Sequence, residues 1–277
     1  MLIREIELFI EEDIGYNDIS CTMVPDTCYN AAIFTKQECT LAGIDVAKSI
    51  FTYFDIDAES EFSNGDRVYP DDIIFKISGS AVSLLRAERL VLNFLGHMCG
   101  IATLTRNCVN TVRRYSDKTK VACTRKTTPG IRKFEKKAVF AGGGDPHRYN
   151  LSDAVMVKDN HIKILGFEEA VNNALELASF TQKVEVEVES VDEAVKAAQM
   201  GVDIIMLDNM KPDEIIHTIQ VLKNKGLNDN VILEVSGGIS PENLEEYAKT
   251  DVDVISMGSL IYMSQWIDIS MEISTTE

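Results

Sequence analysis

The chain has 277 residues, 45% of them hydrophobic and 26% charged, which suits one large α/β domain or two modest domains. Its formal net charge of −17 argues against a general surface for nucleic acid or for an anionic membrane. No apolar run approaches the roughly 20 residues that cross a bilayer, and the acidic start is unlike a signal peptide. We therefore expect a cytoplasmic protein whose six cysteines, which form no CxxC pair, are free thiols.

The first part of the chain predicts a small α+β domain over residues 1–110. An amphipathic helix is expected over residues 2–14, and short strand-like runs separated by turn signals follow over residues 31–79. A helical pattern then covers residues 81–115. Because glycine weakens a helix, we expect this helix to break between Gly96 and Gly100.

The second part, residues 111–277, has a different rhythm, in which short apolar runs alternate with helical segments. The apolar runs are residues 121–122, 154–157, 184–188, 204–207, 231–235 and 252–257. Such alternation is typical of repeated βα units, so we expect an α/β domain of parallel strands that can curl into a barrel. The C-terminal tail can pack back on the N-terminal domain.

Polar or glycine residues follow most of these runs, at the points where the strands are expected to end. They include Arg125-Lys126, Lys158-Asp159-Asn160-His161, Asp208-Asn209, Ser236-Gly237-Gly238 and Gly258-Ser259. Barrel enzymes build their sites at the C-terminal ends of the strands. The repetition therefore predicts a functional site at this end of the sheet.

A cationic segment lies inside this acidic chain. Residues 125–163 carry nine Lys or Arg against four Asp or Glu, which favours a focused anion pocket over a solvated basic face. Since a guanidinium pairs bidentately with carboxylate or phosphate, Arg125 and Arg148 indicate a substrate with more than one anionic group. The glycine run 142–144 directly before Asp-Pro-His147-Arg148 suggests a backbone that approaches a ligand or adopts unusual torsions.

Three carboxylates, Glu185, Glu187 and Glu189, share one face of an expected strand. A solvent-facing edge strand would explain them without a function. The strand is central to the βα series, however, where both faces are normally covered. We therefore favour carboxylates that face the barrel mouth and meet Lys158, a ribose diol or a hydrated Mg²⁺, with Asp208 beside them on the rim.

Glycine turns close the last two apolar runs. Ser236-Gly237-Gly238 follows one run, and Gly258 follows the other. In (β/α) barrels this is the usual position of a phosphate site built from backbone N–H groups. The sequence therefore predicts a phosphate cradle next to the cationic segment.

At these motifs the chain resembles the quinolinate phosphoribosyltransferases. The matching strings are AERLVLNFLGHMCGIAT, TRKTTPG, KKAVFAGGGDPHR, VKDNHI, VEVEV, MLDN, SGGI and ISMG, which span nearly the whole chain. The resemblance implies a small N-terminal α+β domain followed by an incomplete, open α/β barrel of parallel strands. It also implies transfer of phosphoribosyl from phosphoribosyl pyrophosphate to quinolinate with decarboxylation, which gives nicotinate mononucleotide, pyrophosphate and CO2 for NAD biosynthesis.

The resemblance implies roles for the cations. Arg125, His147, Arg148 and Lys158 would hold the two carboxylates of quinolinate. Arg89 would reach the site from the neighbouring subunit of a homo-oligomer, so that active sites are shared between subunits.

It also implies roles on the side of the phosphoribosyl donor. Lys126 would contact the pyrophosphate, while Glu187 and Asp208 would serve the ribose hydroxyls and Mg²⁺, the latter indirectly. Together with Lys158, these three residues are the expected catalytic groups. The expected phosphate cradle consists of Ser236, Gly237, Gly238 and Gly258.

Three positions depart from the commonest family pattern, namely Cys99, Pro146 and Tyr262. Tyr262 stands where histidine is frequent, so a phosphate contact there would have to come from the tyrosine hydroxyl. The main alternative function is a related phosphoribosyltransferase that acts on a different aromatic acid. A more distant alternative is a lyase that forms a Schiff base through Lys158, which borohydride trapping would reveal.

Overall fold

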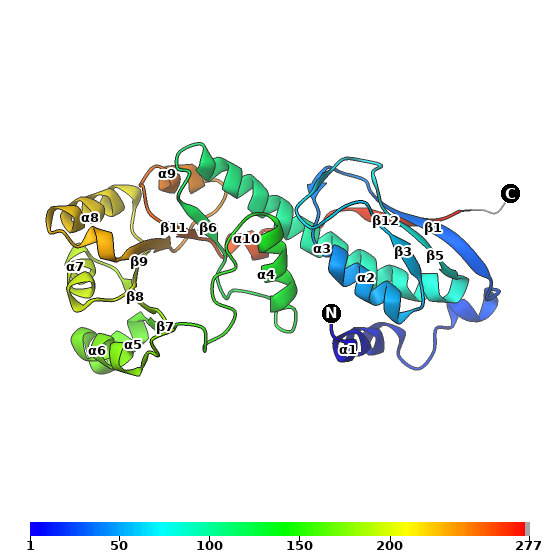
Figure 1. The fold of residues 1–277 in the computed structure, drawn as a ribbon, viewed down its shortest axis with the longest axis horizontal. Coiled ribbons are helices and arrows are strands. Elements are labelled where there is room, and N and C mark those ends of the chain that lie inside the picture. Colours follow the sequence, from blue (N-terminus) through cyan, green and yellow to red (C-terminus); the bar gives the residue numbers. More distant parts are fainter. Residues whose placement is uncertain (275–277) are drawn as a thin grey trace. The chain divides into compact units, whose positions relative to one another are not determined.

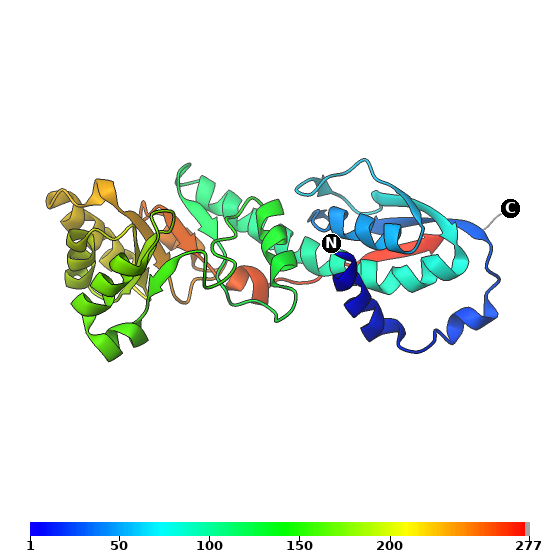
Figure 2. The same ribbon diagram turned by 60° about the horizontal axis from the view of Figure 1, so that its bottom comes forward.

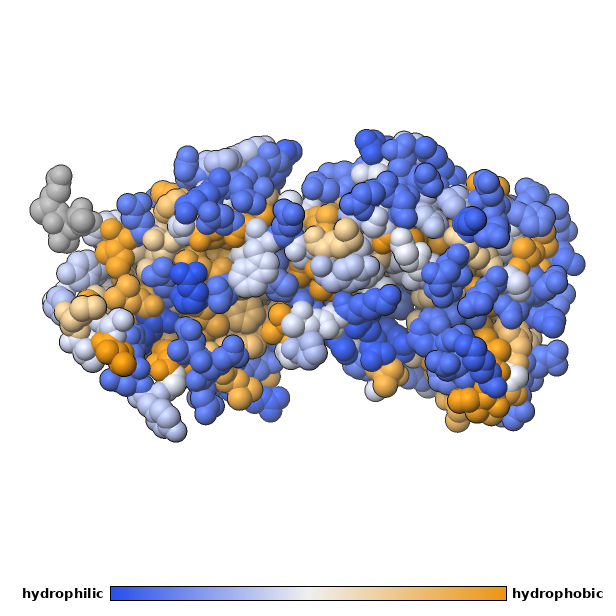
Figure 3. All heavy atoms as spheres, turned by 180° about the vertical axis from the view of Figure 1, so that it is seen from behind, coloured by the Kyte–Doolittle hydropathy of each residue, from blue (hydrophilic) through white to orange (hydrophobic). Residues whose placement is uncertain are grey.

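The computed structural model describes residues 1–274, which form two compact units. The first unit contains Met1–Arg106, Phe140–Gly143 and the segment from Ser264 onward. The second contains Asn107–Val139 and Gly144–Met263. None of the helices in the described part is long and apolar enough to cross a membrane. Hydrophilic residues dominate the face drawn in Figure 3, with smaller apolar patches between them.

The first unit is built on an antiparallel four-stranded sheet in the order β12-β1-β5-β3 (Figure 1). Its strands are β1 (Cys28–Thr35), β3 (Asp57–Glu59), β5 (Ile73–Ser80) and β12 (Ile269–Ile273), and a small second sheet pairs β2 (Cys39–Thr40) with β4 (Arg67–Val68). The helices are α1 (Ile3–Ile14), a 3-10 turn (Ser20–Met23), α2 (Ile44–Tyr53) and α3 (Ala81–Arg113). Figures 1 and 2 show α2 and α3 along the sheet, and Phe51 of α2 packs edge-on against Phe75 of β5 with ring centroids 5.3 Å apart.

Helix α3 is continuous from Ala81 to Arg113, so the expected break between Gly96 and Gly100 is wrong. These glycines instead admit the chain segment that precedes β12. Ile267 N donates to the Gly96 carbonyl at 3.0 Å, and a Cβ on Gly100 would lie 2.1 Å from the carbonyl oxygen of Gln265. Because Gly96 and Gly100 have no side chains, this segment packs closely against α3, and the helix keeps its own hydrogen bonds.

The second unit contains a six-stranded sheet in the order β6-β11-β10-β9-β8-β7, and every pairing in it is parallel. The strands are β6 (Lys120–Ala122), β7 (Val155–Val157), β8 (Val184–Val188), β9 (Ile204–Asp208), β10 (Ile232–Ser236) and β11 (Val254–Ser256). Within residues 1–274 no pairing joins β7 to β6. The expected open α/β barrel of parallel strands is therefore confirmed, and each strand falls on one of the predicted apolar runs.

Helices alternate with these strands. They are α4 (Arg132–Ala141), α5 (Asp159–Leu165), α6 (Phe167–Leu177), α7 (Val191–Met200), α8 (Pro212–Asn224), a 3-10 turn (Asn228–Asn230), α9 (Leu244–Ala248) and α10 (Ser259–Tyr262). Local signals set some of their ends: the Ser190 hydroxyl accepts from Glu193 N and caps α7. Strand starts are also fixed, because Asp203 accepts from Val184 N and Asp253 accepts from Leu233 N at 2.8 and 2.9 Å.

Strand β8 lies between β7 and β9, so it is not an edge strand. Glu185 on this strand is fully buried and Glu187 is half-buried, whereas Glu189 beyond the strand end is exposed. The alternative of a solvent-facing edge strand is thus wrong.

All six cysteines are free, as expected, and only Cys28 among them is exposed.

Candidate active site

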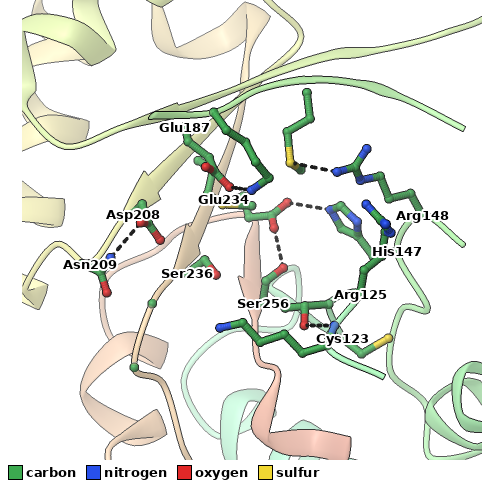
Figure 4. Close-up of a pocket in the computed structure, with 17 residues that line it drawn as sticks. Cys123, Arg125, His147, Arg148, Glu187, Asp208, Asn209, Glu234, Ser236 and Ser256 are labelled. Atoms are coloured by element: carbon green, nitrogen blue, oxygen red, sulfur yellow. Dashed lines mark hydrogen bonds and ion pairs between the residues drawn. The ribbon is translucent and has the colours of Figure 1, made fainter. Parts of the chain in front are cut away.

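A cavity of about 500 Å³ opens at the C-terminal ends of the second unit's strands (Figure 4). It is lined by Cys123, Thr124, Arg125, Lys126, His147, Arg148, Met156, Lys158, Glu187, Met206, Asp208, Asn209, Glu234, Ser236, Gly237, Gly238 and Ser256. Most of these residues end the strands or follow them; Met156, Glu187, Met206 and Glu234 lie within strands, and His147 and Arg148 lie in the loop before β7. Parallel strands bring their carboxyl ends to one edge, and this is why segments far apart in the sequence converge here.

The cationic side of the cavity has little internal compensation. The Nε atom of Arg125 is buried and has no hydrogen-bond partner within residues 1–274. Burial, followed by the charges of Arg148 and Arg132, lowers the pKa of the Arg125 guanidinium. Within residues 1–274, the hydrogen bonds of the Arg148 side chain go to neutral acceptors, the Ala154 carbonyl at 3.4 Å and the Met156 sulfur at 3.2 Å. This side of the cavity is therefore arranged for an anionic ligand.

Hydrogen bonds within and around the segment that carries His147 fix its backbone. His147 has a positive φ of 52°, and its backbone N–H donates to Asp145 Oδ1 at 2.8 Å. Lys136, fully buried on α4, donates through Nζ to the Pro146 carbonyl and lies 3.4 Å from the Cys123 sulfur. A non-glycine residue in this conformation is strained, so these bonds are what keep the imidazole facing the cavity.

The carboxylate side is partly compensated. Glu187 forms an ion pair with Lys158, and the Asn209 side-chain amide donates to Asp208 Oδ2 at 2.7 Å. Glu187 and Asp208 come from the adjacent strands β8 and β9. Carboxylate oxygens are the ligands that Mg²⁺ prefers, so this pair could hold the ion directly or through water.

The turn after β10 lines the cavity with the backbone of two glycines. Gly237 and Gly238 both have positive φ, 97° and 63°. A Cβ on Gly237 would lie 2.3 Å from Asn209 Oδ1, whereas one on Gly238 would meet nothing within 4 Å. Gly237 is therefore required by packing and by torsion, and Gly238 by torsion alone. Exposed backbone N–H groups of this kind suit a phosphate.

Not every expected residue lies at the cavity. Arg89 is on α3 in the first unit, outside the lining. Gly258 also lies outside the lining. A Cβ on Gly258 would come within 3.1 Å of Lys126 Cδ and 3.0 Å of Tyr262 Cε1, so the absence of a side chain leaves room for these two residues. The glycine run 142–144 does not line the cavity, but the unusual torsion expected there is present, since Gly143 has a positive φ of 89°. A Cβ on Gly142 would lie 2.6 Å from the Ala102 carbonyl of α3.

Comparisons with known proteins agree with this arrangement. Family descriptions for the C-terminal and N-terminal domains of quinolinate phosphoribosyl transferase match residues 101–272 and 18–99. The chain belongs to this family. A probable nicotinate-nucleotide pyrophosphorylase [carboxylating] from Methanothermobacter thermautotrophicus is 45% identical over 98% of each chain. The human nicotinate-nucleotide pyrophosphorylase [carboxylating] is 40% identical over 89% of this chain and 83% of its own length.

Solved structures agree as well. NadC from Streptococcus pyogenes is similar with a TM-score of 0.92 and 38% identity, covering 99% of this chain and 96% of its own. The nicotinate-nucleotide pyrophosphorylase of Francisella tularensis has a TM-score of 0.91 and 36% identity, over 98% and 95% of the two chains. The open barrel seen here is therefore the fold of the quinolinate phosphoribosyltransferase family.

Two acidic residues inside the barrel lie beside His147: Glu185 was expected to face the barrel mouth and meet Lys158, a ribose diol or Mg²⁺, whereas Glu234 was not predicted. Glu185 of β8 and Glu234 of β10 are both buried, and each lies close to His147. Burial, and then the charge of Glu234, raises the pKa of Glu185. A signal was present, because a glutamate between apolar residues in the middle of a covered parallel strand requires a partner.

Proposed function

We propose that this protein transfers the phosphoribosyl group of phosphoribosyl pyrophosphate to quinolinate and releases pyrophosphate and CO2, leaving nicotinate mononucleotide. Family membership and the printed names of the relatives support this reaction. The observation that carries it is the pair of Arg125, whose buried Nε has no partner within residues 1–274, and Arg148, which donates to neutral acceptors, beside carboxylates and a glycine turn. Such a cavity suits one ligand with two carboxylates and another with phosphate and ribose.

Quinolinate would lie on the cationic side. Arg125 and Arg148 would pair with its two carboxylates, with His147 and Lys158 completing the contacts. Arg89 would come from the neighbouring subunit of a homo-oligomer, which accords with its absence from the lining of the chain's own cavity. The six free cysteines suit a reducing compartment, so we place the reaction in the cytoplasm.

The phosphoribosyl donor would lie on the carboxylate side. Ser236, Gly237 and Gly238 would bind its 5′-phosphate, and Lys126 its pyrophosphate. Gly258 would act by leaving room for the Lys126 side chain. Glu187 and Asp208 would contact the ribose hydroxyls and hold Mg²⁺, whose charge would offset that of the pyrophosphate.

The chemistry follows from this placement. The pyridine nitrogen attacks ribose C1 as the bond from C1 to the pyrophosphate oxygen breaks, with the electron pair leaving on pyrophosphate. Positive charge then develops on the ribose, where Glu187 and Asp208 stabilise it, while Lys126 and Lys158 counter the negative charges of the two substrates. Holding two mutually repelling anions in contact is the other contribution of the site. Loss of CO2 from the cationic ring and protonation of the ring carbon complete the reaction.

The test is product analysis. Purified protein is incubated with Mg²⁺, phosphoribosyl pyrophosphate and either quinolinate or nicotinate, and the products are identified by mass. We expect nicotinate mononucleotide, pyrophosphate and CO2 from quinolinate and no nucleotide from nicotinate. A folded protein that binds the donor but does not convert quinolinate would contradict the proposal, and a panel of other aromatic acids would then test the alternative substrate class.

A further inference from the structure

Glu234 is a charged residue in the middle of a covered strand, and its two oxygens have separate partners. It lies on β10 with only 2% of its surface exposed. Oε1 accepts a hydrogen bond from the Ser256 hydroxyl of β11, and Oε2 lies 3.3 Å from His147 Nε2. Figure 4 shows Glu234 between these two side chains at the floor of the cavity. Ser256 thus fixes the carboxylate, and the carboxylate meets the imidazole edge.

The groups facing His147 favour its protonated form. Glu185 of β8 places Oε2 at 3.7 Å from Nε2, so two carboxylates flank the same nitrogen. Lys136 of α4 is the cation whose charge acts against protonation of His147, and Arg148 interacts with Glu185. Burial lowers the pKa of His147, but the hydrogen bond and charge of Glu234 outweigh it, and Glu185, whose own pKa burial raises to about 8, adds its charge only when it is ionised. The pKa therefore lies above the ordinary value of 6.5.

We propose that Glu234 is a positioning residue that holds His147 as an imidazolium, with Nε2–H donated to Glu234 and Nδ1–H directed to a carboxylate of quinolinate. A charged donor binds a carboxylate more strongly than a neutral one. A hydrogen-bond partner that fixes one ring nitrogen of a histidine also determines where the other ring nitrogen points. This inference rests on the proposed function and adds Glu234 to the residues that determine recognition of the substrate.

Access from a second cavity gives this assembly a route to solvent protons. His147, Glu185 and Glu234 all line another cavity of about 330 Å³, which is bordered at the strand starts by Lys120 and Lys183. His147 and Glu234 line the first cavity as well. The imidazole therefore lies in the partition between two cavities, and it can equilibrate with solvent while quinolinate fills the first.

The variant Glu234→Gln tests the proposal because it keeps the shape and a hydrogen-bond acceptor but removes the charge. The chain has four histidines, so their ring signals can be titrated by NMR and that of His147 identified from its loss in His147→Asn. We expect the pKa of His147 to fall in Glu234→Gln, since burial then acts with less opposition. Quinolinate affinity, measured by calorimetry, should drop about tenfold at pH 7.5 and much less at pH 6.

The direction follows from the sign of the shift. In the wild type the raised pKa of His147 extends the imidazolium to higher pH, and affinity is lost as pH rises through that raised pKa. In the variant the same loss occurs at lower pH. The matched control is Asp253→Asn, which removes a carboxylate that caps the start of β10 away from the cavity. It should lower thermal stability without moving the pH profile of quinolinate binding.

Three results would overturn the proposal. One is an unchanged pKa of His147 in Glu234→Gln, and another is a loss of affinity by the same factor at every pH, as a purely structural role would give. The third is a stoichiometric divalent metal in the purified protein that is lost on substituting His147, since the three side chains could also ligate an ion. The NMR titration needs no substrate, so its outcome stands apart from whether the wild type converts quinolinate.

Discussion

The two sides of the cavity are prepared for their ligands in opposite ways. On the cationic side, Arg125 has a buried nitrogen without a partner and Arg148 has only neutral acceptors. On the carboxylate side, Glu187 is paired with Lys158 and Asp208 accepts from Asn209. A buried donor without a partner is unfavourable until an acceptor arrives, so we expect an anion to gain more binding energy on the first side. The second side already has partners, which a metal or ribose must displace.

Removing a cation from the first side should have the largest effect. For Arg125→Met we expect kcat/KM for quinolinate to fall by about 10²- to 10³-fold, since one partner of a desolvated charge pair is lost. The melting temperature should stay the same or rise, because no internal ion pair is broken. Steady-state kinetics and thermal unfolding check both parts. Lys163→Met is the control: it breaks an exposed ion pair with Asp159 and should leave kcat/KM unchanged.

If Arg125→Met were strongly destabilised as well as inactive, the guanidinium would have a structural partner in the folded protein. The contrast between the two sides would then fail, because both would be internally compensated.

Neutralising the second side should have a smaller effect. Glu187→Gln leaves Lys158 without its counterion and removes one oxygen ligand from the expected Mg²⁺ site. We expect kcat/KM for phosphoribosyl pyrophosphate to fall about 10- to 100-fold, with a higher Mg²⁺ requirement. Titrating activity with Mg²⁺ at fixed donor concentration measures this. An unchanged Mg²⁺ requirement would place the ion elsewhere and leave Glu187 only its role beside Lys158.

The sequence predicted the arrangement of the site better than it predicted the reasons for its glycines. The apolar runs identified all six parallel strands, and the residues after them, such as Arg125, Lys158 and Asp208, do converge on one cavity. Periodicity and strand direction suffice for this, because the geometry of parallel βα units is general. The buried Glu234 was overlooked because its partner, His147, is 87 residues away in the chain.

A glycine in the sequence shows that a Cβ is absent, but it does not show which atoms of the folded chain occupy the space beside it. The backbone of Gln265 fills it at Gly100, helix α3 fills it at Gly142, and the Asn209 side chain fills it at Gly237. Only the last of these three lies at the cavity. Long-range packing decides between a helix break, a ligand contact and a close approach of two segments, and local sequence carries no information on it.

The paired glycines of the phosphate turn offer a test within the second side. Gly237→Ala would place a Cβ 2.3 Å from Asn209 Oδ1 at a φ of 97°, whereas Gly238→Ala has open space and only the cost of its torsion. We expect Gly238→Ala to lose about 1 kcal/mol of stability and Gly237→Ala several times more. Chemical denaturation measures the difference. Equal losses would mean that Asn209 moves aside, which a changed KM for the donor would reveal.

The smallest effect is expected from Tyr262→Phe. Tyr262 stands where many family members have histidine, but 63% of its surface is exposed and its ring edge lies against Gly258. Removing an exposed hydroxyl while keeping the ring should change the KM for phosphoribosyl pyrophosphate by less than about twofold. A rise of tenfold or more, with kcat unchanged, would instead show that the hydroxyl binds the donor. The phosphoribosyl donor would then be bound on the carboxylate side by a direct contact with the Tyr262 hydroxyl, which is exposed to solvent in the free protein.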